Sequence, residues 1–192
     1  LFTEFENPFN ALDLLWINII MDGPPALTLG LEPIRDDLMK RKPTARGESI
    51  VSAEMMVKIA VNGIFMCFVC LAQKQWNFLG IPMEGENAEA ISNTVIFTLF
   101  VLFQLFNAFN CRELGDRSVF PNFFRNKLML VAFVAAFALQ VVITQFAGLV
   151  FDTVPLGILD WLKIVALAFS VILLDEAIKL VRRADKKSKA NG

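Results

Sequence analysis

The sequence predicts an all-α membrane protein with about five transmembrane helices. The first observation is the composition, because 56% of the 192 residues are hydrophobic and only 19% are charged. A mean hydropathy of +0.56 is too high for an ordinary soluble domain. The second observation is the recurrence of apolar runs of about 20 residues, the length of helix that crosses a bilayer core of about 30 Å. The third is that the charge of the connectors between these runs alternates.

Each predicted helix is an apolar run bounded by polar residues, and the five runs make residues 1–192 one transmembrane domain. The first run contains an acidic residue and a proline pair, and the third carries a row of amide side chains. The second and fourth hold only scattered polar residues, and the fifth leads into a lysine-rich tail. The predicted spans are residues 11–31, 51–72, 91–111, 127–149 and 156–181.

The distribution of Lys and Arg among the connectors predicts the orientation. Residues 32–50, residues 112–126 and the tail after residue 181 are rich in basic residues, whereas residues 73–90 and 148–155 are not. Basic connectors lie on the cytoplasmic side of a membrane. We therefore expect the N-terminus outside, the C-terminus in the cytoplasm and an odd number of spans.

The first span combines an intramembrane acid with a helix break. Asp22 lies about halfway along this span and is followed by Gly23, Pro24 and Pro25. A carboxylate at the bilayer centre costs about 2.5 to 3.5 kcal/mol on insertion scales, so such a residue indicates a functional site. Because proline has no amide hydrogen, the pair frees two backbone carbonyls one turn earlier. Free carbonyls at membrane depth are tolerated where they line a cavity.

Asn18 lies four residues before Asp22, so both residues lie on one face of the helix before the break. The chain has no histidine, so a metal site in it would use oxygen ligands. Calcium takes six to eight hard oxygen ligands in irregular geometry, and broken helices supply ion sites in transporters. Asn18, Asp22 and the freed carbonyls therefore predict part of a calcium site. The alternative is a proline-kinked helix whose Asp22 is neutral or paired with a basic residue.

The third span places amide side chains at Gln104, Asn107 and Asn110, three residues apart on one face. Gln104 and Asn107 could extend an ion path from the first span. The alternative is that these amides hydrogen-bond to neighbouring helices, as amides in membrane helices commonly do. Near the cytoplasmic end of the fifth span, we expect Asp175 and Glu176 to pair with basic residues that follow them.

Residues 14–33 resemble the sixth membrane helix of type II P-type ATPases, with the run Leu-Leu-Trp-Ile-Asn-Ile-Ile-Met-Asp-Gly-Pro-Pro-Ala followed by Glu-Pro. The resemblance continues in Gln-Leu-Phe-Asn-x-x-Asn at residues 104–110 and Arg-Ser-Val-Phe at residues 117–120. It covers the whole chain as helices six to ten, the C-terminal transmembrane region of a calcium-transporting pump similar to the plasma-membrane and Golgi types.

The resemblance implies ATP-driven outward transport of a cation through a phosphorylated aspartate. By position, Asn18 and Asp22 correspond to ligands of the single calcium site in plasma-membrane and Golgi pumps. Met21 and Gln104 stand where two-site pumps have a threonine and an acidic ligand, which argues against a second calcium site. Gln104 also favours the plasma-membrane type over the Golgi type, which carries an aspartate there.

The chain contains no Asp-Lys-Thr-Gly-Thr phosphorylation motif, so we expect no catalytic residue in it and no ATPase activity from it alone. ATP and magnesium would bind the upstream part of the parent protein. The expected partners are the lipid bilayer and the upstream helices and cytosolic domains of that protein, with no nucleic acid. The short loops favour a multi-pass protein of a bacterial cell membrane. The alternatives are a pump for manganese or another cation and a stand-alone channel or structural subunit.

Overall fold

The computed structural model describes residues 9–32, 49, 51–83, 85, 87–113 and 115–190, with the side chains of all of these except residues 21, 22 and 190. Every regular element in this part of the chain is a helix, which confirms the predicted all-α class. The elements are α1 (Ala11–Asp22), α2 (Pro24–Gly30), α3 (Ala53–Trp76), α4 (Ala88–Cys111), the 3₁₀ helix η2 (Phe120–Asn122), α5 (Lys127–Phe146), α6 (Gly148–Phe151) and α7 (Ile158–Ala190).

The helices follow the predicted spans in order, with two differences in form. α3, α4 and α5 are each long and apolar enough to cross a membrane. The first predicted span consists of two short helices, α1 and α2, separated by the single residue Gly23. The fifth lies within α7, whose 33 residues extend about 50 Å, well beyond a bilayer core of about 30 Å. The number of spans and their orientation remain predictions.

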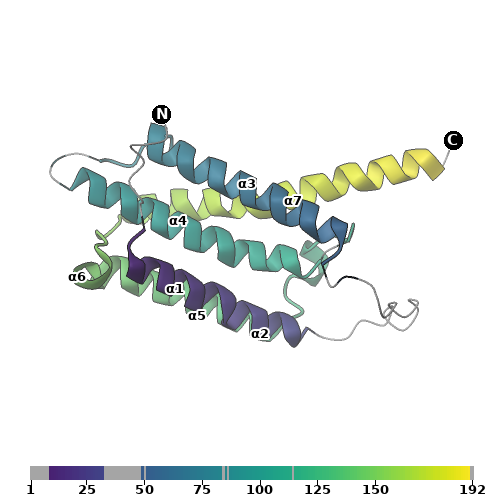
Figure 1. The fold of residues 1–192 in the computed structure, drawn as a ribbon, viewed down its shortest axis with the longest axis horizontal. Helices are drawn as coiled ribbons and strands as arrows, with labels where there is room; N and C mark the ends of the chain where they lie inside the picture. The colour runs from purple at the N-terminus through teal and green to yellow at the C-terminus, as the bar shows by residue number, and fades with distance from the viewer. Residues whose placement is uncertain are drawn as a thin grey trace.

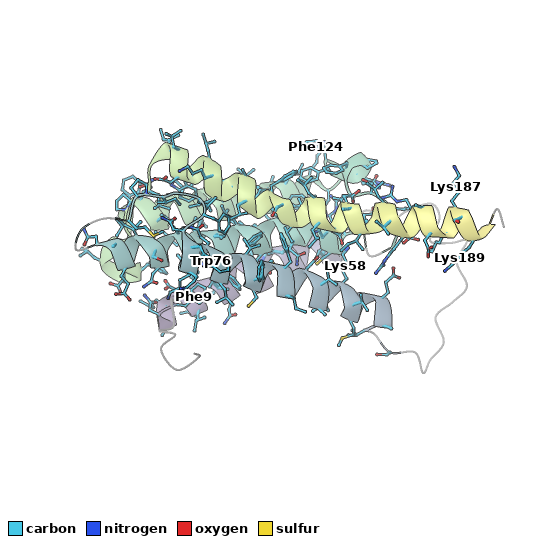
Figure 2. The ribbon with its side chains drawn as sticks, turned by 90° about the horizontal axis from the view of Figure 1, so that it is seen from above. Phe9, Lys58, Trp76, Phe124, Lys187 and Lys189 are labelled. Carbon is cyan, nitrogen blue, oxygen red and sulfur yellow. The ribbon has the colours of Figure 1, made fainter. Side chains whose placement is uncertain are left out.

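The bundle is built around α4. Its apolar side chains are almost all buried, whereas α3 and α5 bury only part of theirs. α4 packs extensively against α7 and also contacts α3, α5 and α1. Figure 1 shows α1 and α2 continuing in one direction alongside α5, with α6 beside the start of α1. The C-terminal part of α7 projects past the other helices, and Lys187 and Lys189 lie on this projection (Figure 2).

Asparagine and serine side chains fix the starts of three helices. Asn10 and Asp13 form a capping box at the start of α1, where each side chain accepts a hydrogen bond from the other residue's backbone amide. Ser52 caps α3 and Asn126 caps α5, and each side chain accepts one hydrogen bond from a backbone amide three residues later. These caps satisfy amides that have no partner within the helix.

A buried chain of polar side chains joins α1, α5 and α4. The indole nitrogen of Trp16 donates to Gln140 Oε1 at 3.0 Å, and Gln140 Nε2 donates to the Thr144 hydroxyl at 3.3 Å. The Thr144 hydroxyl in turn lies 3.3 Å from that of Thr98. Gln140, Thr144 and Thr98 are fully buried. Because an apolar interior offers no other partner, these contacts specify how the three helices face one another.

Replacing Gln140 with methionine is expected to lower the stability of the bundle by about 1 kcal/mol. Methionine has a similar length but leaves the Trp16 indole nitrogen without its acceptor. Thermal unfolding in detergent would measure the loss, with Leu139→Met as the control, because Leu139 is an exposed neighbour on the same helix. Unfolding of Gln140→Met at the wild-type temperature would show that this chain of contacts contributes nothing.

Candidate cation site

The break between α1 and α2 falls at Gly23, whose backbone angles, φ −77° and ψ −80°, are not those of a helix. A Cβ atom at this position would lie 3.1 Å from the carbonyl oxygen of Ile19, closer than side chains normally approach backbone. Helix α2 then starts with the two prolines, which suits them because the first amides of a helix need no helical partner. The predicted break residues Gly23, Pro24 and Pro25 therefore form a real interruption of the helix.

Asn18 lies on the face of α1 that none of the described helices covers. The opposite face buries Ile17 and Ile20 in the core, at 5% and 3% exposure. Asn18 is exposed, as are Leu14 and Leu15 one turn earlier. An amide that faced lipid would lose its hydrogen bonds, so such a position is costly unless another polar group covers it.

Asp22 is the last residue of α1, one turn after Asn18 and directly before the break. Its side chain lies outside the described residues, so only its position along the helix places it beside Asn18. Among the side chains that the structure describes, no three His, Cys, Asp or Glu residues come close enough together to hold a metal ion. A cation site at the break would therefore depend on amide and backbone oxygens together with Asp22.

Gln104 and Asn107 lie on α4 but have different surroundings. Gln104 lines a largely apolar groove of about 420 Å³ between α3 and α4, together with Met66, Cys70 and Phe100. The side-chain oxygen of Asn107 accepts hydrogen bonds from Asn62 Nδ2 of α3 at 2.9 Å and from Asn110 Nδ2 at 3.4 Å. Asn107 thus joins two helices, as the alternative interpretation of the amide row expected, and Gln104 is the amide that faces open space.

The end of α2 is held by an ion pair that follows the break by about two turns. The Arg112 guanidinium donates to both carboxylate oxygens of Glu32, from NH2 at 2.8 Å and from Nε at 3.0 Å. Asn126 Nδ2 donates to Glu32 Oε2 and to the backbone oxygen of Thr28. The Arg112 side chain is only 2% exposed. These contacts connect the end of α2 to the C-terminal end of α4 and to the N-terminal end of α5.

A second ionic cluster closes the same end of the bundle around α7. Lys179 pairs with Asp175 at 2.8 Å and with Glu176 at 3.2 Å, as the sequence led us to expect. Lys58 of α3 is a partner that was not predicted: it pairs with Asp175 at 3.1 Å and donates to the backbone oxygen of Asn110 at 2.8 Å. The signal in the sequence was the position of Lys58 near the start of the second predicted span. Two lysines thus balance two buried carboxylates: Lys179 is buried, and the Lys58 side chain is 13% exposed.

Asp13 is a further ionisable residue whose burial was not predicted from the sequence. It lies in the first turn of α1 and is only 5% exposed. Its position just inside the first predicted span was the signal that could have identified it, because a buried acid in a membrane helix is costly. It faces the opposite end of the bundle from the two ionic clusters.

Comparison with known proteins gives a consistent result over nearly the whole chain. The family model described as "Cation transporting ATPase, C-terminus" matches residues 6–181. The chain is 35% identical over 190 residues to calcium-transporting ATPase type 2C member 2 of Rattus norvegicus, covering 98% of this chain and 20% of the rat protein. It is 37% identical over 183 residues to calcium-transporting ATPase 1 of Yarrowia lipolytica, covering 91% and 18%.

Plasma membrane calcium-transporting ATPase 2 of Oreochromis mossambicus is 33% identical over 186 residues, which cover 92% of this chain and 16% of that protein. The chain therefore spans about a fifth or less of the length of these relatives.

Proposed function

Since this chain belongs to the family of the cation-transporting ATPase C-terminus, we propose that it forms part of the intramembrane calcium site of an ATP-driven pump. It is a multi-pass membrane protein. In this proposal Asn18, Asp22 and the backbone carbonyls freed by Pro24 and Pro25 contribute one side of a single site. ATP, magnesium and the phosphorylated aspartate belong to the rest of the parent protein.

The observation that carries this proposal is the exposure of Asn18 on the uncovered face of α1, one turn before a helix break. A stable membrane bundle does not leave an exposed amide facing lipid without a partner. Calcium suits the donors at this position, which are oxygens from an amide, a carboxylate and free carbonyls. Three relatives that share the region are themselves described as calcium-transporting ATPases.

The surroundings of this face also support a partner of the same parent protein. The groove beside Gln104 is lined almost entirely by apolar atoms and lies between α3 and α4, with Phe9 at its side. Exposed apolar residues continue along α1 and α3, among them Leu15, Ile19 and Phe68. A further transmembrane helix packed on this surface would cover the apolar residues and bring polar ligands opposite Asn18.

Asn18→Ala in the full-length protein should raise the calcium concentration for half-maximal ATP-driven uptake into vesicles roughly tenfold, because one oxygen ligand is lost. Leu14→Ala is the matched control, since Leu14 is exposed on the same face but offers no ligand. An unchanged calcium dependence in Asn18→Ala would remove Asn18 from the site. Competition by manganese in the same assay would distinguish a calcium pump from a manganese pump.

A flux measurement on the 192-residue chain distinguishes a stand-alone channel from part of a pump. Reconstituted alone in liposomes, it should pass no calcium, because one side of the site and the energy-coupling parts are missing. Calcium movement without ATP would favour the channel.

A further inference from the structure

A cavity of about 530 Å³ opens at the end of the bundle where α1 and α4 begin. Its wall combines the first turn of α1, the first turns of α4 and the segment around α6, which lie together in Figure 1. The lining residues that carry polar side chains include Asn10, Asp13, Glu89, Asn93 and Asp152. Among the described residues, no Lys or Arg lines it. By the predicted orientation, this end faces away from the cytoplasm.

The buried carboxylate of Asp13 is the first feature of the cavity wall that points to a ligand. Its Oδ2 atom accepts the backbone amide of Asn10 at 2.9 Å, which completes the helix cap. Its Oδ1 atom is buried and has no hydrogen-bond partner among the described residues. The residue is only 5% exposed, so little of it contacts bulk water. A buried carboxylate oxygen without a hydrogen bond costs free energy, and a positively polarised group beside it would lower that cost.

The opposite wall adds two further oxygen-bearing groups. Asn93 Oδ1 of α4 is also buried without a partner in the described part of the chain. Asp152 lies where the backbone turns with φ +48°, a conformation that aspartate and asparagine tolerate better than most residues.

Gly148 permits this turn, since a Cβ atom there would lie only 2.5 Å from the backbone oxygen of Thr153. A tightly built turn therefore holds a second carboxylate against the cavity.

We propose that this cavity binds a hydrated, oxygen-preferring divalent cation, held mainly through its water shell. Direct coordination is not favoured, because the described acidic side chains do not gather in threes close enough to hold a bare metal ion. A shell of six to eight waters of about 30 Å³ each fits the cavity volume. The site is separate from Asn18 and Asp22 and does not depend on the function proposed for them.

Manganese ions alone can test this site, because their paramagnetism broadens the fluorine resonance of a nearby 5-fluorotryptophan. Trp16 packs edge-on against Phe151, which lines the cavity, with ring centroids 6.2 Å apart. The 192-residue chain in nanodiscs would be titrated in an Asp22→Asn background, so that an ion at the helix break does not contribute. Manganese should broaden the Trp16 resonance, identified by its absence in Trp16→Phe, and calcium should reverse the broadening.

Adding Asp13→Asn should raise the manganese concentration for half-maximal broadening about tenfold, because one of the facing charges is lost. The asparagine oxygen can still cap α1. Asp152→Asn should act in the same direction and keeps a residue that accepts the positive φ.

Asp160→Asn is the matched control, a carboxylate near the same end that does not line the cavity, and it should leave the titration unchanged. The proposal is overturned if neither cavity variant shifts the titration, or if Asp160→Asn shifts it as much as they do.

Discussion

If the proposed function holds, Asp22→Asn in the full-length protein should abolish calcium-dependent phosphorylation from ATP at low calcium, with a loss of apparent calcium affinity of at least about a hundredfold. The reason is electrostatic, because in the proposed site the substitution would remove a full negative charge next to a divalent ion in a medium of low dielectric constant. Asparagine keeps the size and one oxygen. The measurement is the level of phosphorylated enzyme as a function of calcium concentration.

The control for this experiment is Asp185→Asn, which removes a carboxylate from the exposed C-terminal part of α7, where it pairs with Lys189. It should leave the calcium dependence unchanged. Normal phosphorylation of Asp22→Asn at low calcium would mean that Asp22 is not a ligand. In that case the alternative, a kinked helix with a neutral or paired aspartate, would account for the break.

Arg112→Ala should destabilise the membrane domain by about 3 kcal/mol. The substitution removes the three charged hydrogen bonds that Arg112 donates to the partly buried Glu32 carboxylate, and breaking a buried pair in this way costs roughly 3 to 5 kcal/mol. The partly exposed Glu32 side chain, at 19%, places the expected value at the lower end. Thermal unfolding of the protein in detergent measures the loss.

A second Arg–Glu ion pair in this chain serves as the control for Arg112→Ala. Arg182 contacts Glu54 with the same nitrogen to oxygen distance, 2.8 Å, but both side chains are about a third or more exposed. Because water screens that pair, Arg182→Ala should cost at most about 1 kcal/mol. Equal effects of the two substitutions would show that burial of the Arg112 contact does not matter.

The Arg112 contact also bears on the candidate site, because it holds the end of α2. Glu32→Gln keeps the hydrogen-bonding shape but removes the charge, so it tests the ion pair without leaving a void. If the pair positions the segment after the break, this variant should weaken apparent calcium affinity in the full-length protein as well as stability.

Residues close together in the sequence determined the local features of the site. Hydropathy predicted where the helices lie, since crossing a bilayer needs only a sufficient length of apolar residues. The interruption after Asp22 was equally local, because Pro24 and Pro25 lack the amide hydrogens that a continuous helix needs. The alignment of Asn18 with Asp22 follows from the helical repeat alone.

Contacts between residues far apart in the sequence could not be predicted in this way. Glu32 and Arg112 are separated by 80 positions, and nothing in either neighbourhood specifies the other as a partner. Lys58 was equally unexpected as a partner of Asp175, because the nearer basic residues along α7 seemed sufficient from the sequence. Ion pairs of this kind depend on which helix faces are brought together.

By itself, the sequence therefore determined a helical membrane protein with a broken first helix and an oxygen-rich turn, because hydropathy, proline chemistry and the helical repeat act over a few residues. Only the tertiary structure decided that Asn18 lies on an uncovered face, that Asn107 joins two helices and that Asp13 faces a cavity. The physical reason is that burial and hydrogen-bond partners depend on how distant helices pack, and a side chain's role follows from those neighbours.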